Sequence, residues 1–426
     1  MQTTSTLHEI PDQPQLEKKF LRLRTINRIV LAGVILVDLY LLYELIFDYS
    51  IGMKLVAMVS LTIISSLFWI SSLDLILQEK APLDSLGNEE TIGKYSVGEI
   101  KTLVSSVFEA YQDKREIPHI YITYDGDTNV LVLNSLLFNR IKSQNAIYIS
   151  EPLFHIFKKD ELKAIISHEL GHFYKYTSPV QRMKTFIFFL AGLLPVSLHA
   201  SDPFATIWGF IGTWVLIALV LFIIFFGVLD GPFGKMEEYL CDYYAAQRHG
   251  NLSIINALLT LGKRQELEEF ITHEIVNRVK ADNTLSTSQV AEILRAIDQT
   301  LSNKRMVAEE ELKEAVITFF ESDEIDKFRT ELTDAEVESE SQEIEKFIGE
   351  FFDKHDFQIL DWNLFDFGEK DMRIDEAEYP HLIDALLKHP DAQLFNLAAD
   401  NKPKTVDETH PTFGERILFL HKADHE

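Results

Sequence analysis

The sequence predicts an integral membrane protein in which α-helical hairpins are joined to a mainly α-helical, α+β soluble domain with a small β-sheet. Three observations lead to this prediction. Long apolar runs alternate with polar segments before residue 230. Short runs of β-branched and aromatic residues lie between residues 120 and 149, and the rest of the chain has a helical apolar pattern. The length of 426 residues allows two or three domains.

The chain is strongly acidic, but its charge is unevenly distributed. The formal net charge is −26, although 46% of the residues are apolar. Residues 261–426 contain 40 acidic and 19 basic side chains, whereas residues 1–260 contain 26 and 21. A basic footprint of the kind that binds nucleic acid is missing, so the composition argues against a nucleic-acid partner. The single cysteine, Cys241, excludes an internal disulfide and a multi-cysteine metal site.

The first predicted transmembrane hairpin covers residues 29–77. Its two apolar stretches, residues 29–47 and 51–77, flank a short turn, and each can cross a hydrocarbon core, which needs roughly 20 residues. The preceding residues 1–28 form a polar segment that ends in a basic cluster of Lys18, Lys19, Arg22, Arg24 and Arg28. The positive-inside rule places this segment in the cytoplasm, and the hairpin returns the chain to that side.

Asp38 lies near the middle of the first apolar stretch. A carboxylate at that depth costs free energy, so we expect it to face the interior of a helix bundle or a wet cavity. The sequence leaves open whether Asp38 has a function or is simply protonated or paired with Lys54.

Residues 78–184 are predicted to form the first part of the soluble domain. Residues 96–111 have the apolar pattern of an amphipathic helix. A second helix is predicted from residue 159 through residue 174. Between the two helices, short strands are predicted at residues 120–123, 129–133 and 146–149.

A second transmembrane hairpin is predicted over residues 185–229. Its first stretch, residues 185–200, is short for a membrane span and contains Pro195. Its second stretch, residues 207–229, is long and carries no charge before Asp230. The alternative is a pair of helices buried in the core of a soluble protein.

The rest of the chain is predicted to be soluble and helical. Residues 230–263 form the second part of the soluble domain, and residues 405–426 form a short C-terminal element. Between them, residues 264–404 form an acidic helical insertion. Its run of glutamates is typical of a solvated helix face or a flexible segment, and a partner for the insertion stays unknown.

The predicted helix at residues 159–174 contains an H-E-x-x-H pattern formed by His168, Glu169 and His172. Four residues are close to one helical turn, so both imidazoles project from one face and can bind a single zinc ion. Glu169 is displaced by about 100° around the helix. This offset lets its carboxylate reach a water molecule beside the metal and act as a general base.

A catalytic zinc ion needs a third protein ligand, and the sequence offers three candidates. Glu238 lies one helical turn before Asp242, so it could bind zinc while Asp242 accepts a hydrogen bond from a ligating imidazole. Cys241 could supply a thiolate instead. Asp230 is the third candidate, because Leu229-Asp230-Gly231 resembles the LDG motif of intramembrane site-2 proteases.

Taken together, these motifs resemble the membrane zinc metallopeptidases that include bacterial HtpX and the CAAX prenyl proteases. Residues 164–172 read AIISHELGH and look like the zinc helix of that family. Residues 238–242 look like its E-x-x-x-D helix, and a predicted membrane hairpin lies between the two. Residues 410–417 read HPTFGERI and look like its late H-P-x-x-x-x-R-I element.

The resemblance implies a zincin catalytic domain of the gluzincin type and a role for each matching residue. His168, His172 and Glu238 would bind one Zn²⁺ per subunit, and Glu169 would be the catalytic base. Asp242 would orient the site, and the resemblance also implies that it could serve as a proton donor. The remaining implied residues are His410 and Arg416, which would approach the active site, and Asn129, which would mark the edge strand that binds substrate.

The resemblance also has departures. The helix that carries Glu238 begins Gly234-Lys235-Met236, whereas an Arg is usual where Lys235 stands. Val130 replaces the usual alanine in the edge strand, so the substrate preference can differ.

The expected function is that of a membrane-bound zinc endopeptidase that acts on polypeptides. Its expected substrates are misfolded proteins of the cytoplasmic membrane, and membrane lipid would surround its hairpins. The alternatives are a prenyl-protein protease, an intramembrane site-2-type protease, and a proteolytically silent zinc scaffold or sensor.

Overall fold

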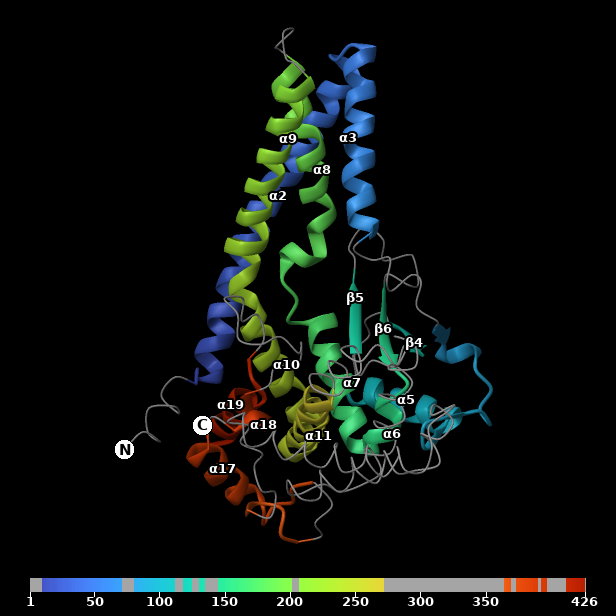
Figure 1. Cartoon of the computed structure of the whole chain (residues 1–426), viewed down its shortest axis with the longest axis vertical. Coiled ribbons are helices and arrows are strands. Elements are labelled where there is room, and N and C mark those ends of the chain that lie inside the picture. The colour runs from blue at the N-terminus through green and yellow to red at the C-terminus, as the bar shows by residue number, and fades with distance from the viewer. Residues whose placement is uncertain are drawn as a thin grey trace, which may run out of the picture.

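The computed structural model describes residues 10–70, 80–111, 118–124, 130–134, 145–200, 207–271, 364–368, 373–389, 392–396 and 411–425. Long helices form one end of the molecule, and a compact body of helices with a small sheet forms the other (Figure 1). The expected mainly helical structure with a small β-sheet is confirmed over these residues.

Four helices form the elongated end: α2 (Gln13–Phe47), α3 (Ile51–Ile70), α8 (Pro179–Ala200) and α9 (Ile207–Phe222). Helix α8 packs against the other three. Their shared interior is mainly apolar and includes Leu31 and Leu190, together with Phe225 from the segment after α9. Asp38 of α2 and Ser60 of α3 are also buried. The helical path of α9 continues through a π-helical segment (Ile223–Asp230) and a short 3₁₀ turn (Gly231–Phe233) into α10 (Gly234–His249).

The outer surface of these four helices is also apolar. Ile29 and Leu36 of α2, Ile51 of α3 and Phe222 of α9 are each at least 60% exposed. Two described helical segments, Gln13–Phe47 and Ile211–His249, are long and apolar enough to cross a membrane, and Ile51–Ile63 and Phe186–Leu198 are shorter apolar helices. The two complete transmembrane hairpins stay a prediction.

A four-stranded sheet with the order β1-β4-β6-β5 lies beside the helices of the body. It consists of β1 (Lys80–Pro82), β4 (His119–Thr123), β6 (Asn145–Ser150) and β5 (Val130–Asn134). The pair β4 and β6 is parallel, and the other two pairs are antiparallel. Strands β2 (Thr91–Ile92) and β3 (Tyr95–Ser96) form a separate small ribbon.

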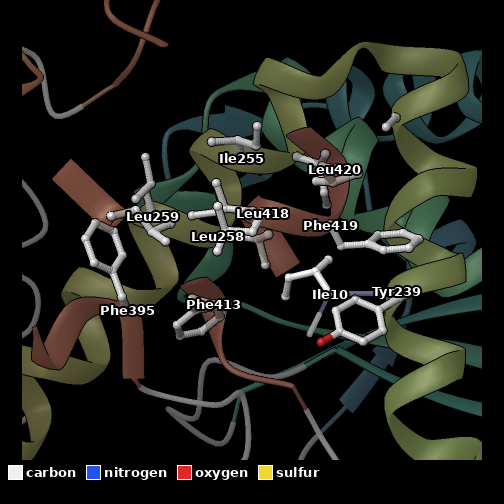
Figure 2. Packing of buried hydrophobic residues seen from close by; sticks show 14 of the residues in the cluster. Ile10, Tyr239, Ile255, Leu258, Leu259, Phe395, Phe413, Leu418, Phe419 and Leu420 are labelled. Atoms are coloured by element: carbon white, nitrogen blue, oxygen red, sulfur yellow. The ribbon is translucent and has the colours of Figure 1, made fainter. Parts of the chain in front are cut away.

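Two apolar clusters hold the body together. One cluster packs the sheet against α5 (Val97–Tyr111), the short α6 (Leu153–Ile156) and α7 (Lys159–Tyr174), through residues such as Ile147 and Leu170. The other joins α10 to α11 (Asn251–Ile271), α17 (Tyr379–Lys388), α18 (Gln393–Asn396) and α19 (Phe413–His425). Figure 2 shows this second cluster, in which Phe413 and Phe419 of α19 meet Leu258 of α11 and Tyr239 of α10.

The described part of residues 264–404 belongs to this second cluster. Phe365, Ile374 and Leu382 are buried in it with α10 and α11. The side-chain amide of Asn256 on α11 donates to the backbone carbonyl of Ile374, at 2.9 Å, and accepts from its backbone N–H, at 2.7 Å. Residues 309–352, with the glutamate run, lie outside the described residues. The predicted boundaries of the insertion stay a prediction.

Candidate metal centre

Helices α7 and α10 cross closely because Gly171 faces Cys241. A methyl group at Gly171 would lie 2.9 Å from Cys241 Sγ and 3.2 Å from its Cα, so only glycine permits this approach. Cys241 is fully buried, and desolvation together with the nearby carboxylates raises the pKa of its thiol well above the ordinary value. The structure places this thiol between the helices, outside the group of residues that can hold a metal.

The same helix contact brings His168, His172 and Glu238 together. Their candidate ligand atoms all lie within 4.8 Å of one another. The two Nε2 atoms are 3.2 Å apart, and Glu238 places Oε2 at 3.4 Å from Nε2 of His168 and Oε1 at 3.3 Å from Nε2 of His172. A tetrahedral zinc ion with bonds of about 2.0–2.1 Å would separate neighbouring ligand atoms by about 3.3 Å. These three residues therefore fit a zinc ion in both donor type and spacing.

Glu169 follows His168 on α7 and is partly exposed. Desolvation raises the pKa of its carboxyl group, while the neighbouring His168 and His172 oppose this rise. A carboxylate whose pKa is raised is a stronger base than an ordinary glutamate. The role of Glu169 as the general base stays a prediction.

Asp242 connects His168 to the C-terminal helix. Its Oδ1 atom is 2.8 Å from Nδ1 of His168. Arg416 of α19 forms a fork with the same carboxylate, with Nη2 at 2.6 Å from Oδ1 and Nε at 2.7 Å from Oδ2. A further nitrogen of Arg416, Nη1, lies 3.3 Å from Glu238 Oε2. All four side chains are buried, so these charged contacts are weakly screened by water.

The charges of this network shift the pKa values of its members. Desolvation alone would raise the pKa of Asp242, but Arg416 and His168 lower it below the ordinary value. Desolvation lowers the pKa of His168, but the hydrogen bonds and charges of Asp242 and Glu238 outweigh it and raise the pKa to about 10. The carboxylates therefore favour positive charge at this point, which suits a bound cation.

The start of α19 fixes the position of Arg416. Thr412 and Glu415 cap the helix reciprocally: the Thr412 N–H donates to the Glu415 carboxylate at 2.9 Å, and the Glu415 N–H donates to Thr412 Oγ1 at 3.2 Å. His410 and Asn129 lie outside the described residues. Their roles, like the roles of the other predicted site residues, stay predictions.

The structure also bears on two features of the sequence. Asp230 is not a member of the three-donor group found in the described part of the chain, where Glu238 takes the third position. Sequence reasoning missed Glu237, whose Oε2 lies 3.9 Å from Nδ1 of His172. Its place directly before Glu238 is the only sequence signal that could have indicated it.

The comparisons with known proteins agree with this geometry. A family model described as peptidase family M48 matches residues 104–424. Neither a curated protein nor a solved structure matches the chain. The matched region includes the zinc-binding pattern on α7, the Glu238 helix and α19. This chain therefore belongs to peptidase family M48, a family of zinc-dependent metallopeptidases.

Proposed function

We propose that this metallopeptidase is a membrane-bound zinc endopeptidase that hydrolyses polypeptides at the cytoplasmic face of a membrane. The observation that carries the proposal is the close group of His168, His172 and Glu238. Glu169 lies on α7, the helix that carries the two histidines. A purely structural metal site would not need a carboxylate in the position of Glu169, which argues against a silent scaffold.

The proposed chemistry divides the work between the metal and the protein. A zinc ion held by His168, His172 and Glu238 would supply a Lewis acid for the scissile carbonyl and for water. The Glu169 carboxylate would take a proton from the attacking water and deliver it to the leaving amine. Asp242 would hold the ring of His168 through Nδ1, and Arg416 would fix Asp242. His410 would donate a hydrogen bond to the developing oxyanion.

Strand β5 supports the proposed mode of substrate binding. It occupies one end of the described strand order β1-β4-β6-β5 and lies beside α7. An extended peptide could add to its outer edge through main-chain hydrogen bonds, and Asn129, which precedes β5 in the sequence, would take part. This arrangement would place the peptide next to the zinc helix.

The apolar outer surface of α2, α3, α8 and α9 supports the membrane location. Exposed aliphatic side chains over several turns are costly in water and suit lipid. The N-terminal part of α2 lies at the end of the molecule that holds the compact body (Figure 1), and Lys18, Lys19 and Arg22 on this part are exposed. We therefore propose four spans, with the basic end of α2 and the metal centre in the cytoplasm. Misfolded membrane proteins are the substrates that this placement favours.

The decisive experiment replaces Glu169 with glutamine in the full-length protein purified in detergent. The variant should lose casein degradation and self-cleavage while it retains about one equivalent of zinc. The wild-type protein with a chelator is the control for metal dependence. Proteolysis by the Glu169→Gln variant would overturn the mechanism, and a wild-type protein that binds zinc but cleaves nothing would favour the scaffold.

A comparison of membrane-protein abundance in cells that express either the wild-type protein or the Glu169→Gln variant would identify the substrate class.

A further inference from the structure

Both histidines of the metal centre are flanked by carboxylates on the two nitrogens of the ring. His168 has Glu238 beside Nε2, at 3.4 Å, and Asp242 beside Nδ1, at 2.8 Å. His172 has Glu238 beside Nε2, at 3.3 Å, and Glu237 beside Nδ1, at 3.9 Å. The two rings are thus surrounded in the same order: the shared ligand Glu238 on the inner nitrogen, and a second carboxylate on the outer nitrogen.

This arrangement matches what a metal-binding imidazole requires. When Nε2 faces the metal, the ring proton lies on Nδ1 and needs an acceptor. That acceptor fixes the tautomer and the orientation of the ring, and its loss typically weakens metal binding by about 10–100-fold. Asp242 is this acceptor for His168. Among the described residues, the carboxylate that lies opposite Nδ1 of His172 is that of Glu237.

We propose that Glu237 is a positioning residue that orients His172 for metal binding by accepting the proton on Nδ1. This inference rests on the proposed zinc peptidase function and adds a residue to it. The separation of 3.9 Å is that of an ion pair and is longer than a direct hydrogen bond. Rotation of the Glu237 side chain toward the ring would shorten this separation to that of a hydrogen bond.

The surroundings of Glu237 make the proposal more specific. Its side chain is only 14% exposed, and Oε1 has no hydrogen-bond partner in the part of the chain that the structure describes. A carboxylate held among other acids destabilises the fold unless a positive group faces it. The Nδ1–H group of a metal-bound His172 would supply this positive partner, because a metal ion on Nε2 makes the opposite side of the ring more positive.

The test measures metal binding, because activity alone would not separate positioning from catalysis. The Zn²⁺ dissociation constants of wild type, Glu237→Ala and Glu237→Gln are determined by competition with a chromophoric chelator, on full-length protein in detergent. Alanine removes the acceptor and should weaken Zn²⁺ binding by about 10–100-fold. Glutamine keeps an acceptor oxygen and should lie closer to wild type than to alanine. The visible spectrum of the Co²⁺-loaded protein should change in the alanine variant only.

Several controls keep the result interpretable. Glu109→Ala removes an exposed glutamate from α5 and should leave Zn²⁺ affinity unchanged. If Glu237→Ala does not fold, Glu237→Leu fills the space without an acceptor and replaces it. Wild-type Zn²⁺ affinity in the alanine or leucine variant, or equal loss with alanine and glutamine, would overturn the proposal. Neither result would affect the proposed peptidase function, which fails only if the wild-type protein does not bind zinc or does not cleave peptides.

Discussion

At the scale of single residues, the absence of one methyl group at Gly171 sets the distance between the two helices of the metal centre. We predict that Gly171→Ala destabilises the protein by about 1–3 kcal/mol, because the added methyl would lie 2.9 Å from Cys241 Sγ. Since His172 is the next residue, the same change should also weaken Zn²⁺ binding. Thermal unfolding and chelator competition measure the two effects.

The matched control is the double variant Gly171→Ala with Cys241→Ala. It removes the Sγ atom but keeps the Cβ of residue 241, so it should recover part of the lost stability and Zn²⁺ affinity. A single Gly171→Ala variant with wild-type stability would show that α7 and α10 can separate without cost. No recovery in the double variant would show that the clash with sulfur is not the cause.

Sequence reasoning identified the candidate ligands better than the residues that support them. The spacing of His168 and His172, and that of Glu238 and Asp242, follows from the helical repeat and is readable from the sequence. Arg416 came only from the family resemblance, because its contact with Asp242 depends on the packing of α19. Glu237 was missed because its role depends on which ring nitrogen of His172 it faces, and no spacing rule gives that.

At the scale of elements, the first turn of α7 is held by Arg373, which lies 212 residues further along the chain than Glu161. Arg373 Nε lies 2.5 Å from Glu161 Oε1, and Nη2 lies 3.1 Å from both Glu161 Oε2 and the carbonyl oxygen of Ile156. The Glu161 side chain is 4% exposed, and Oε2 also accepts from the backbone N–H of Lys158 at 2.7 Å. Arg373 therefore ties the segment before α17 to the first turn of α7.

We predict that Arg373→Ala destabilises the protein by about 3 kcal/mol, because it leaves the charge of Glu161 buried without its arginine. The measurement is the free energy of unfolding in detergent. Lys388→Ala is the control, since it removes a cation from the same part of the chain, where Lys388 forms an exposed pair with Asp384. This variant should change stability far less. Equal effects of the two substitutions would show that the Arg373 contact contributes nothing specific.

The helices were easier to predict than their ends. Residues 96–111 and 159–174 were predicted as helices, and α5 (Val97–Tyr111) and α7 (Lys159–Tyr174) confirm this. Helix α2 begins at Gln13, well before the apolar stretch that starts at residue 29. Its polar first turns stay helical because Leu16 and Phe20 are buried against the body, a contact that apolar periodicity alone does not reveal. The three-residue strand β1 was missed, because it is too short for an alternating pattern.

At the scale of the whole molecule, the first and last segments that the structure describes meet beside the compact body of helices. Lys422 of α19 pairs with Asp12 and donates to the carbonyl oxygen of Ile10 at 2.8 Å. Glu17 of α2 pairs with Lys175, at 2.9 Å, just after the zinc helix. Within the described residues, the N-terminal helix that leads into the apolar end and the C-terminal helix are therefore joined directly. Sequence patterns could not show this, because these contacts join residues that are far apart in the chain.

The proposed membrane topology leads to the prediction at this scale. If four helices span the membrane, the turn between α2 and α3 lies on the opposite side from α5 and the rest of the body (Figure 1). The chain suits cysteine labelling, because its single cysteine, Cys241, is fully buried and should not react. Ser50 in the turn and Glu109 on α5 are both exposed, so each can be replaced by cysteine on its own.

A membrane-impermeant maleimide should label Ser50→Cys in intact cells and Glu109→Cys only after the cells are permeabilised. The chain without an added cysteine is the background control and should stay unlabelled in both conditions. The opposite pattern would place the metal centre outside the cell and reverse the orientation given by the basic end of α2. If neither variant is labelled until permeabilisation, then α2 and α3 do not cross the membrane, and their apolar surface must be covered by protein instead of lipid.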